Sequence, residues 1–562
     1  MIDRMRIRWE EKKKRLLLYL KENPITSKTI VSSLSIQAKH AGYFAMLPEN
    51  LDLEAHIQRY PLTCYKFIDL GGHIMSIPPT GATFGSYFDK ERMIHLLGLI
   101  TSARADNRDA IDESDFVPIH SRRIRKYFKD YLSYLDYLIM TGIVDCDRQY
   151  FVGERPRRYK LSLRFKSAPL IPYYYSYFNP SDVNSIEEDV YNERTNSFYR
   201  NTLLEMPYLS HWYNQKKLEL NPLAEIYAFD SMRIKQSLGC SHWDISDVWD
   251  AAYRGYKRKN PRAQYDAIIQ NINEVKIHHY KAKIDANVHR LHSVLTYMQS
   301  EYRNFLTYDG QQLVCIDIKN SQPYLLNLLL NREFWDENST LPISINNLPL
   351  NIQELFTSPS ELLPTIRGFF ESLNEENYRE FQEYIPLAAS GHLYEAIVTR
   401  ALQIKTYQID RKKAKKNLLI LFYSPNREEG SSRRTYIVEK VFCEKFPTIM
   451  GLIRLIKSNY NGTEARNNHS RFACLLQSIE SEIVLHRCCR RIWEEANHQV
   501  PIFTIHDSIV TTSEHADYLR DVMMQELTVC IGVPPTLEPE VWSLSNPDLD
   551  QNIFAGAQVQ HS

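Results

Sequence analysis

Two short apolar segments that each lead into an aspartate constrain this chain more than any other feature. The first, Leu313–Ile316, is followed directly by Asp317, and the second, Ile502–Ile505, ends two residues before Asp507. Both have the length and composition of a strand, and Ile509–Thr512 returns after the second aspartate like the other arm of a hairpin. The aspartates are 190 positions apart (507 − 317). We expect neighbouring strands of one sheet to bring the two carboxylates together.

Length and composition are those of an ordinary globular protein. A chain of 562 residues is too long for one core, and 43% apolar with 24% charged residues is typical. Lys plus Arg equals Asp plus Glu, 68 each, so nucleic-acid binding would need local basic patches. The apolar runs fall short of the roughly 18 residues that cross a membrane, and acidic residues near the N-terminus argue against a targeting peptide. Nine cysteines without a CxxC pair favour reduced thiols. We expect a cytoplasmic protein without a membrane partner.

The segment 86–165 has the pattern of a winged helix. Periodicity predicts helices at about 88–102 and 130–141, with another starting near Ser121, and then strands at 143–145, 150–152 and 158–161. Helices followed by an Arg-rich β-ribbon are typical of that DNA-binding module. Arg157 and Arg158 of the ribbon could contact phosphates; the alternative is a solvated basic hairpin.

Other segments are less informative. Helices are expected at about 8–22 and throughout about 243–275, and a polar insert at 332–365. The tyrosines of 173–177 are typical of core packing. Asp52 and Glu54 have the spacing of an exonuclease motif without convincing partners, so a helix cap is the better interpretation and we expect no exonuclease. Paired histidines lack a cysteine cluster, so zinc is not expected.

A basic helix is predicted between the two aspartates in the sequence. Arg411, Lys415, Leu419 and Tyr423 stand at i, i+4, i+8 and i+12, a stripe along about 18 Å of helix. That length suits a nucleoside triphosphate, with the cations against the phosphates and the aromatic ring against sugar and base. A solvated basic face is the alternative for such a helix taken alone.

Two strand-end carboxylates facing a cationic helix are what nucleotidyl transfer requires. The reaction uses two divalent cations about 3.5–4 Å apart, one at the attacking 3′-oxygen and one at the triphosphate. Mg²⁺ prefers oxygen ligands and keeps several waters, so two bridging carboxylates can suffice. We therefore expect Asp317 and Asp507 to bind two Mg²⁺ ions, for which Mn²⁺ can substitute. Lys415 would compensate charge on the leaving pyrophosphate.

These residues resemble a known family. Asp317, the Arg411-x3-Lys415-x7-Tyr423 helix and the His506-Asp507-Ser508 turn resemble, in order and spacing, motifs A, B and C of the family A (DNA polymerase I-like) DNA polymerases and the single-subunit phage and mitochondrial RNA polymerases. Three further matches lie in sequence: Arg290 resembles the arginine that contacts the primer-template, Gly391–Glu395 a fingers segment, and Gln477 the glutamine that reads the minor groove. The resemblance covers about 285–530, under half the chain.

The resemblance implies an α+β right-hand polymerase fold, with thumb-like helices, a palm and fingers. The expected division is residues 1–85 of unknown role, a winged-helix-like domain at 86–165, a linker and thumb-like region at 166–300, palm and fingers at 301–545, and a tail at 546–562. It also implies that the backbone carbonyl of Ile318 joins Asp317 and Asp507 as a metal ligand. Further implied roles are nucleotide binding by Arg411, Lys415, Leu419, Tyr423 and Gln322, and primer-template binding by Arg290, Gln477 and His506.

Departures from the family pattern bear on the sugar of the substrate. Gln322 stands five residues after Asp317, where the family's DNA polymerases place a Glu that excludes a 2′-hydroxyl and its RNA polymerases a Gly. A bulky glutamine there favours DNA synthesis, as does Gln477. Ser508 is instead similar to the RNA enzymes, and Leu419 replaces the aromatic of the DNA enzymes. If Ser321-Gln322 instead matches a Ser-Gln pair of the DNA polymerases, the residue that would exclude the 2′-hydroxyl (the sugar gate) is undefined.

The sequence thus predicts a template-directed DNA polymerase that acts on a DNA primer-template and nucleoside triphosphates, of a kind suited to a phage, plasmid or mobile element. One alternative is a single-subunit-type RNA polymerase or primase-like enzyme. The other is a DNA-binding replication initiator with an inactive polymerase-like body.

Overall fold

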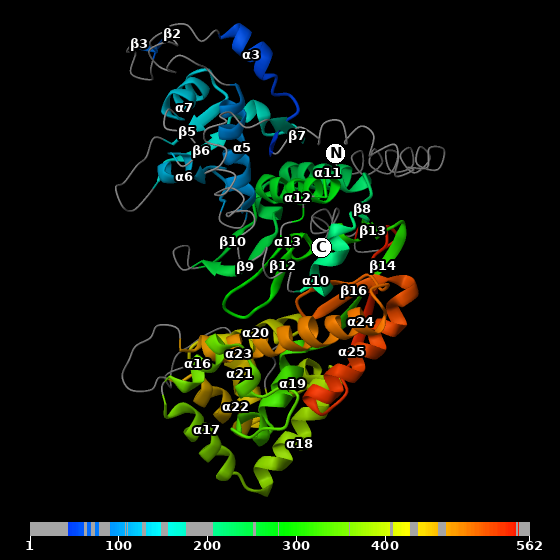
Figure 1. The fold of residues 1–562 in the computed structure, drawn as a ribbon. Coiled ribbons are helices and arrows are strands. Elements are labelled where there is room, and N and C mark those ends of the chain that lie inside the picture. Colours follow the sequence, from blue (N-terminus) through cyan, green and yellow to red (C-terminus); the bar gives the residue numbers. More distant parts are fainter. Residues whose placement is uncertain are drawn as a thin grey trace.

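The computed structural model of this chain describes residues 43–60, 65–68, 74–77, 90–106, 108, 111–125, 131–147, 156–175, 206–250, 255–278, 280, 282–358, 360–404, 409–426, 436–458, 468–546 and 549. The fold is a mixture of helix and sheet (Figure 1). It has two hydrophobic cores, one mostly within residues 45–175 and a larger one mostly within residues 206–549. The expected helix at about 8–22 lies outside the described residues.

The N-terminal unit contains the smaller core. Strand β1 (Tyr43–Pro48) pairs antiparallel with β7 (Leu170–Tyr175), and α5 (Lys90–Asp106) packs against both. A three-stranded sheet has the order β4 (Val117–Pro118), β6 (Arg158–Leu161), β5 (Val144–Cys146). The other elements of the unit are α3 (Leu53–Arg59), β2 (Tyr65–Ile68), β3 (Ile74–Ile77), α6 (Ser121–Arg125) and α7 (Tyr131–Met140).

Most local predictions for this unit are confirmed. The helices expected at about 88–102, from Ser121 and at about 130–141 are α5, α6 and α7, and strands β5 and β6 lie where expected. The strand expected at 150–152 falls outside the described residues. Asp52 caps α3, accepting a hydrogen bond from the Ala55 backbone N–H at 3.0 Å. Glu54 forms an ion pair with Lys90.

The prediction of continuous helix over about 243–275 is wrong in its first half. Residues Ile245–Asp250 and Gly255–Arg258 form an antiparallel hairpin, β9 and β10, because β-branched and aromatic side chains favour strands. Helix α12 (Pro261–Lys276) begins only at Asn260, whose side chain accepts from the backbone N–H groups of the first turn, with Pro261 next. Helix α11 (Leu223–Leu238) packs beside α12.

The larger core surrounds a six-stranded sheet. Its path is β15 (Phe503–Ile505), β16 (Ser508–Thr512), β14 (Gln311–Ile318), β13 (Leu306–Tyr308) and β8 (Leu218–Leu220), and β17 (Leu537–Val541) pairs with the other edge of β14. Leu313–Ile316 of β14 is buried, as its continuous apolar run predicts. Helix α25 (Ala516–Ile531) packs against β14 and β16. The two predicted strand segments are therefore direct neighbours.

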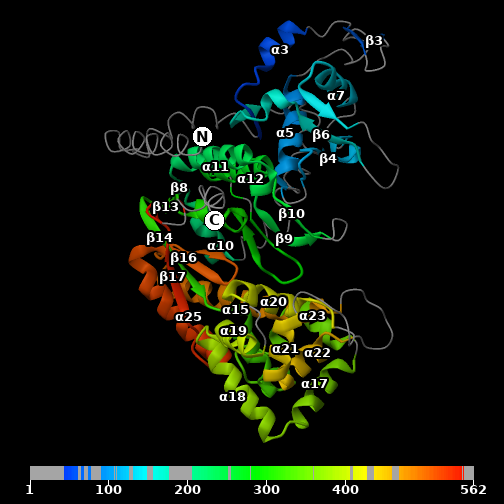
Figure 2. The same cartoon turned by 180° about the vertical axis from the view of Figure 1, so that it is seen from behind.

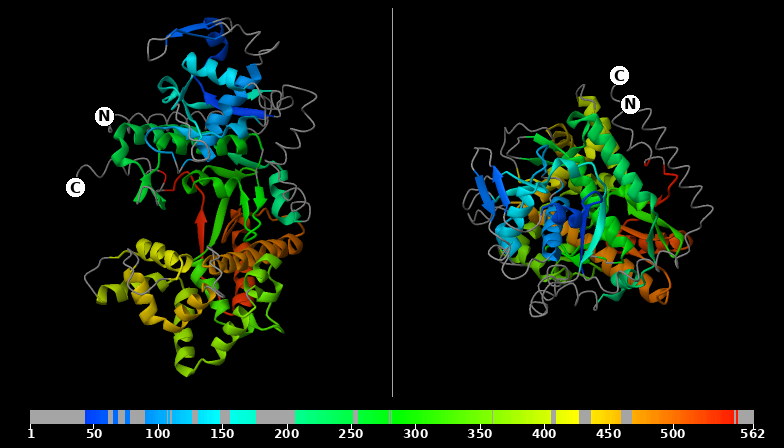
Figure 3. Two further views of the ribbon diagram at one scale, coloured as in Figure 1. Left: turned by 90° about the vertical axis from the view of Figure 1, so that its left-hand side faces the viewer. Right: turned by 90° about the horizontal axis from the view of Figure 1, so that it is seen from above.

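A helical body adjoins this sheet. Figure 3 (left) shows the strands between the α11–α12 pair above and the helical body below, and Figure 2 shows α15, α19, α20 and α23 grouped next to the sheet. The helices are α15 (Ser321–Leu329), α16 (Leu350–Thr357), α17 (Leu362–Glu371), α18 (Glu375–Ala389), α19 (Leu393–Ile404), α20 (Arg411–Tyr423), α21 (Tyr436–Lys445), α22 (Pro447–Ile456) and α23 (Ser470–Ser481), which continues into π-helical η5 (Glu482–Cys489) and α24 (Arg490–Glu495). The basic helix thus has the bounds that the sequence predicts.

Short elements connect these parts. They are α10 (Pro207–Asn214), η2 (Cys240–His242), β11 (Ala282–Ile284), β12 (Leu291–Ser293), α13 (Val294–Tyr297), α14 (Ser300–Arg303), η3 (Arg332–Trp335) and η4 (Ile345–Asn347). In the described ranges, no helix combines the length and apolarity that a membrane span requires.

Candidate active site

The register of the central sheet places the two aspartates side by side. Asp317 on β14 pairs directly with Ser508 on β16, and Ser508 also pairs with Ile505 on β15, so His506 and Asp507 form a two-residue turn. Paired Cα atoms in an antiparallel ladder are about 4.5–5.5 Å apart and neighbouring Cα atoms 3.8 Å, so the Cα atoms of Asp317 and Asp507 lie within about 9 Å.

The charges around Asp317 fit this proximity. Burial and the charge of Asp507 raise the pKa of Asp317 to about 7, although the Lys415 ammonium lowers it. Glu538, opposite Asp317 on β17, also raises this pKa, although its own carboxylate binds the Lys319 ammonium at 2.7 Å. The structure therefore brings Asp317, Asp507 and Lys415 together, as the sequence predicts.

The turn that carries Asp507 has a constrained backbone. His506 has φ +55°, in the left-handed region that the first position of a two-residue hairpin turn requires. For a residue with a Cβ this conformation costs about 1–2 kcal/mol. The Ser508 hydroxyl donates to the Ile505 carbonyl at 2.9 Å and closes the turn. Burial, together with the Arg290 and His292 charges, lowers the pKa of His506 to about 4, so a neutral imidazole lies beside Asp507.

Helix α20 presents its stripe to this end of the sheet. Lys415 is exposed and interacts with Asp317, and Leu419 is half-buried. Arg411 is already engaged: its Nε donates to Glu395 Oε1 on α19 at 2.6 Å, and its guanidinium lies over the Tyr394 ring at 5.6 Å. No sequence pattern indicated the Arg411–Glu395 pair.

A glycine allows α19 to approach the sheet end. Gly391 has φ +77°, and a Cβ built there would lie 2.3 Å from the Cδ atom of Lys319. A side chain at this position would strain the backbone, and its Cβ would displace the side chain of Lys319. The segment that contains Gly391 therefore packs directly on Lys319, the first residue after β14.

A group of four buried or half-buried polar residues, which we call the polar cluster, lies next to the aspartates. It consists of Gln322 on α15, Tyr423 on α20, Glu480 on α23 and Arg290. The Tyr423 hydroxyl donates to Gln322 Oε1 at 2.8 Å, and Gln322 Nε2 donates to Glu480 Oε2 at 2.7 Å. Arg290 Nε donates to Glu480 Oε1 at 2.8 Å. Gln477 also hydrogen-bonds to Tyr423.

Electrostatics couple the polar cluster to the aspartates. Glu480 is only 1% exposed; burial and the charges of Asp507 and Asp317 raise its pKa, whereas the Arg290 guanidinium lowers it. Burial and the charge of Glu480 raise the pKa of Tyr423 above its usual value. Gln322 and Tyr423, predicted for nucleotide contact, and Arg290 and Gln477, predicted for primer-template contact, thus lie in one hydrogen-bonded group.

Arg290 is presented by a well-ordered turn. The Asp285 carboxylate accepts from the backbone N–H groups of Asn287, Val288 and Arg290 at 2.9, 2.9 and 3.1 Å. The Ser481 hydroxyl on α23 donates to the Val288 carbonyl at 3.0 Å and ties the turn to the helix that carries Glu480.

Glu480 and Asp285 were missed by the sequence reasoning. For Glu480 a signal existed, because it lies at helical spacing from the apolar residues Leu476, Ile483 and Val484. An acid on the buried face of a helix requires a partner. For Asp285 nothing in the sequence distinguished a turn-former from an ordinary surface acid.

The ribbon arginines belong to the N-terminal unit, apart from this group. Arg158 begins β6, and its Nε donates to Asp147 Oδ2 at 2.8 Å; Arg157 is exposed. The tip of the ribbon before Pro156 falls outside the described residues.

The donor set at the sheet end suits a hard cation. Across the described part of the chain, no three His, Cys, Asp or Glu side chains form a metal-binding group. Asp317 and Asp507 are two neighbouring carboxylates of like charge, which repel each other unless a cation lies between them. Carboxylates and a backbone carbonyl are the oxygen ligands that Mg²⁺ prefers, and it takes its remaining ligands from water and phosphates.

Comparisons with known proteins give little further information. No family model and no curated protein matches the chain. Among solved structures, the chain is similar to the POL domain of Pol1 from M. smegmatis, determined in complex with a DNA primer-template and dNTP. The two share 11% sequence identity over 64% of this chain and 72% of that one, with a TM-score of 0.33. A score this low does not establish a common fold.

Proposed function

We propose that this chain is a template-directed DNA polymerase that transfers a nucleotide from a dNTP to a 3′-hydroxyl by a two-metal mechanism. The observation that carries the proposal is the antiparallel register of β14 and β16, which sets Asp317 next to the turn holding Asp507. Lys415 on α20 interacts with Asp317, so a triphosphate bound near the two carboxylates would meet a cation.

Each residue then has a definite task. Asp317, Asp507 and the Ile318 carbonyl would hold two Mg²⁺ or Mn²⁺ ions, which, when bound, activate the 3′-hydroxyl and neutralise the triphosphate. Lys415 would bind the phosphates and compensate the charge of the leaving pyrophosphate. Arg411 would join it through its other guanidinium N–H groups, because Glu395 holds Nε at 2.6 Å.

The contacts of Gln322 support a deoxyribonucleotide substrate. Its side chain is 7% exposed and bonded to Tyr423, so the position five residues after Asp317 is filled by a fixed, bulky group. Such a group would exclude a 2′-hydroxyl from the sugar site. Ser508, which completes the turn with a neutral side chain, favours the second candidate, a single-subunit-type RNA polymerase or primase-like enzyme.

Primer extension tests the proposed activity. A hairpin primer-template is incubated with the full chain, Mg²⁺ or Mn²⁺, and either dNTPs or NTPs, and the products are sequenced. We expect template-directed addition of dNTPs that stops when the metal is chelated. Preference for NTPs would favour the RNA polymerase. Duplex binding without extension under any condition would favour the initiator with an inactive body.

Replacement of Gln322 tests the sugar assignment. Gln322→Ala removes the bulk that would exclude the 2′-hydroxyl, so kcat/KM for dNTPs divided by that for NTPs is expected to fall about tenfold or more, or ~1.4 kcal/mol. Gln312→Ala, at an exposed position of the same strand that leads to Asp317, is the matched control. An unchanged ratio for Gln322→Ala would remove Gln322 from this role.

The N-terminal unit is proposed to bind duplex DNA as a winged-helix-like domain. Support comes from three helices, α5, α6 and α7, with the three-stranded sheet β4-β6-β5. Arg157→Ala is expected to make the slope of log affinity against log salt concentration less negative by about 0.9, which is the contribution of one phosphate contact. Arg158→Ala should have a smaller effect because Asp147 already binds its side chain.

Duplex affinity measured at several salt concentrations checks this prediction. Arg379→Ala, which removes an exposed arginine on α18, is the matched control and should leave the slope unchanged. A slope that Arg157→Ala does not alter would indicate a solvated basic hairpin instead.

A further inference from the structure

Glu480 has no task in the two-metal scheme, yet it is the most deeply buried member of the polar cluster. A carboxylate at 1% exposure is strongly destabilising unless its oxygens are bonded. Here both oxygens are used: Oε1 accepts from Arg290 at 2.8 Å and Oε2 accepts from Gln322 at 2.7 Å. The same carboxylate therefore binds the proposed sugar-gate residue and the proposed primer-template arginine.

The hydrogen bonds of the polar cluster run in one direction. A glutamine amide can present either its oxygen or its nitrogen to a neighbour, whereas the Glu480 carboxylate, whose charge is balanced by the Arg290 guanidinium at 2.7 Å, accepts. Glu480 therefore requires Gln322 Nε2, which leaves Gln322 Oε1 to accept from the Tyr423 hydroxyl at 2.8 Å. The orientation of the Gln322 amide is assigned from this pattern of partners.

We infer that Glu480 is a positioning residue for substrate selection: it fixes the Gln322 amide, and through it Tyr423, in the arrangement that excludes a 2′-hydroxyl. Its bond to Arg290 sets the gate and the primer-facing arginine at a constant distance from each other. This inference rests on the proposed polymerase function and deepens it. It assigns sugar selectivity to a residue on α23, 158 positions from Gln322.

The isosteric change Glu480→Gln tests this role. An amide at position 480 can donate or accept, so Gln322 is no longer held in one orientation. We expect the ratio of kcat/KM for dNTPs to that for NTPs to fall about tenfold, equivalent to ~1.4 kcal/mol. Glu482→Gln is the matched control, because Glu482 is a partly buried acid on the same helical run that faces Arg490 and Arg487. It should leave the ratio unchanged.

A double variant separates positioning from general packing. If Glu480 acts through Gln322, then Glu480→Gln combined with Gln322→Ala should have the same ratio as Gln322→Ala alone. A further fall of similar size in the double variant would mean that Glu480 acts independently of Gln322 and would overturn the inference. Thermal unfolding of each variant serves as the stability control.

A variant that exchanges the two side chains provides a test even if one of the single substitutions prevents folding. Glu480→Gln with Gln322→Glu keeps one carboxylate and one amide in the polar cluster, with an amide now donating to a carboxylate at position 322. We expect this variant to regain discrimination to within about threefold of the original chain. Loss of discrimination in the folded exchange variant would also overturn the inference.

The outcomes distinguish this inference from the proposed function. An unaltered chain that extends no primer rejects the polymerase. An active chain whose sugar ratio is unchanged by Glu480→Gln, but changed by Gln322→Ala, rejects only the role of Glu480.

Discussion

Asp507→Asn is expected to abolish primer extension, lowering the single-turnover rate by about a thousandfold or more. Metal-assisted charge stabilisation contributes several kcal/mol to the transition state, and each 1.36 kcal/mol is about tenfold in rate. An amide retains the size of the side chain but removes the negative charge that would bind the cations. Asp317→Asn should have a comparable effect, because both carboxylates serve the same cations. The measurement is single-turnover incorporation of one dNTP at saturating Mg²⁺.

The loss must be separated from unfolding. Asp507 and Asp317 repel each other across the turn, so neutralising either one is expected to leave the unfolding temperature unchanged or raised. Asp309→Asn provides the matched control: this exposed aspartate lies in the turn before β14 and pairs with Lys217. If Asp507→Asn extended primers at more than about a tenth of the original rate, the metal assignment would be wrong, whatever the stability of the variant.

The site was largely predictable because its elements are locally encoded. Arg411–Tyr423 is one helix whose stripe follows from the 3.6-residue period, and Asp410 caps it by accepting from the Lys413 N–H at 2.7 Å. The Phe503–Thr512 hairpin follows from two apolar runs separated by two residues. The pairing of β14 with β16 could be expected only because both apolar segments lead into an aspartate and the proposed chemistry requires the two carboxylates together.

What the sequence did not reveal depends on long-range partners. In the hairpin β9–β10, tertiary pairing prevailed over an apparent helical pattern, which is common for short segments. Glu480 and Arg290 are 190 residues apart, and neither position by itself identifies the other. Contacts of this kind are fixed by the folded geometry, and no local periodicity encodes them.

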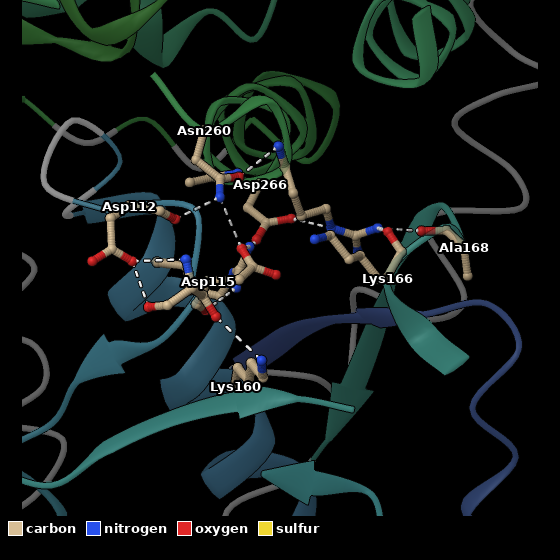
Figure 4. A network of polar contacts seen from close by, with 11 residues as sticks. Asp112, Asp115, Lys160, Lys166, Ala168, Asn260 and Asp266 are labelled. Atoms are coloured by element: carbon tan, nitrogen blue, oxygen red, sulfur yellow. Dashed lines mark hydrogen bonds and ion pairs between the residues drawn. The ribbon is translucent and has the colours of Figure 1, made fainter. Parts of the chain in front are cut away.

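A second buried network of this kind joins the two hydrophobic cores. Arg104 on α5 donates through Nε to Asp266 Oδ2 on α12 at 2.7 Å, and Arg262 donates to Asp266 Oδ1 at 2.9 Å (Figure 4). Arg104 also binds Asp115 Oδ1 at 2.8 Å. Burial opposes the charge of Arg104, but Asp266 and Asp115 outweigh it and hold its pKa above the usual value. Asn260 adds a bond from Nδ2 to Asp115 at 3.1 Å.

Asp266 is the centre of this network, since two guanidinium groups share its carboxylate. All three side chains are at most 4% exposed. The network attaches the N-terminal unit, with its ribbon arginines, to α12. Any DNA held by the unit would be oriented relative to the aspartates through this attachment.

Asp266→Ala is therefore expected to destabilise the chain by about 3–5 kcal/mol, because removing one partner of a buried ion pair leaves uncompensated charge. Two arginines lose their common acceptor, while Asp115 remains for Arg104 only. Chemical denaturation followed by tryptophan fluorescence measures the change, and limited proteolysis should show earlier cleavage between the N-terminal unit and α12. Glu225→Ala is the matched control: it breaks the half-buried pair between Glu225 on α11 and Lys276 on α12, the helix of Asp266, and should cost no more than about 1 kcal/mol. Equal effects of the two substitutions would mean that the network does not stabilise the junction of the two cores.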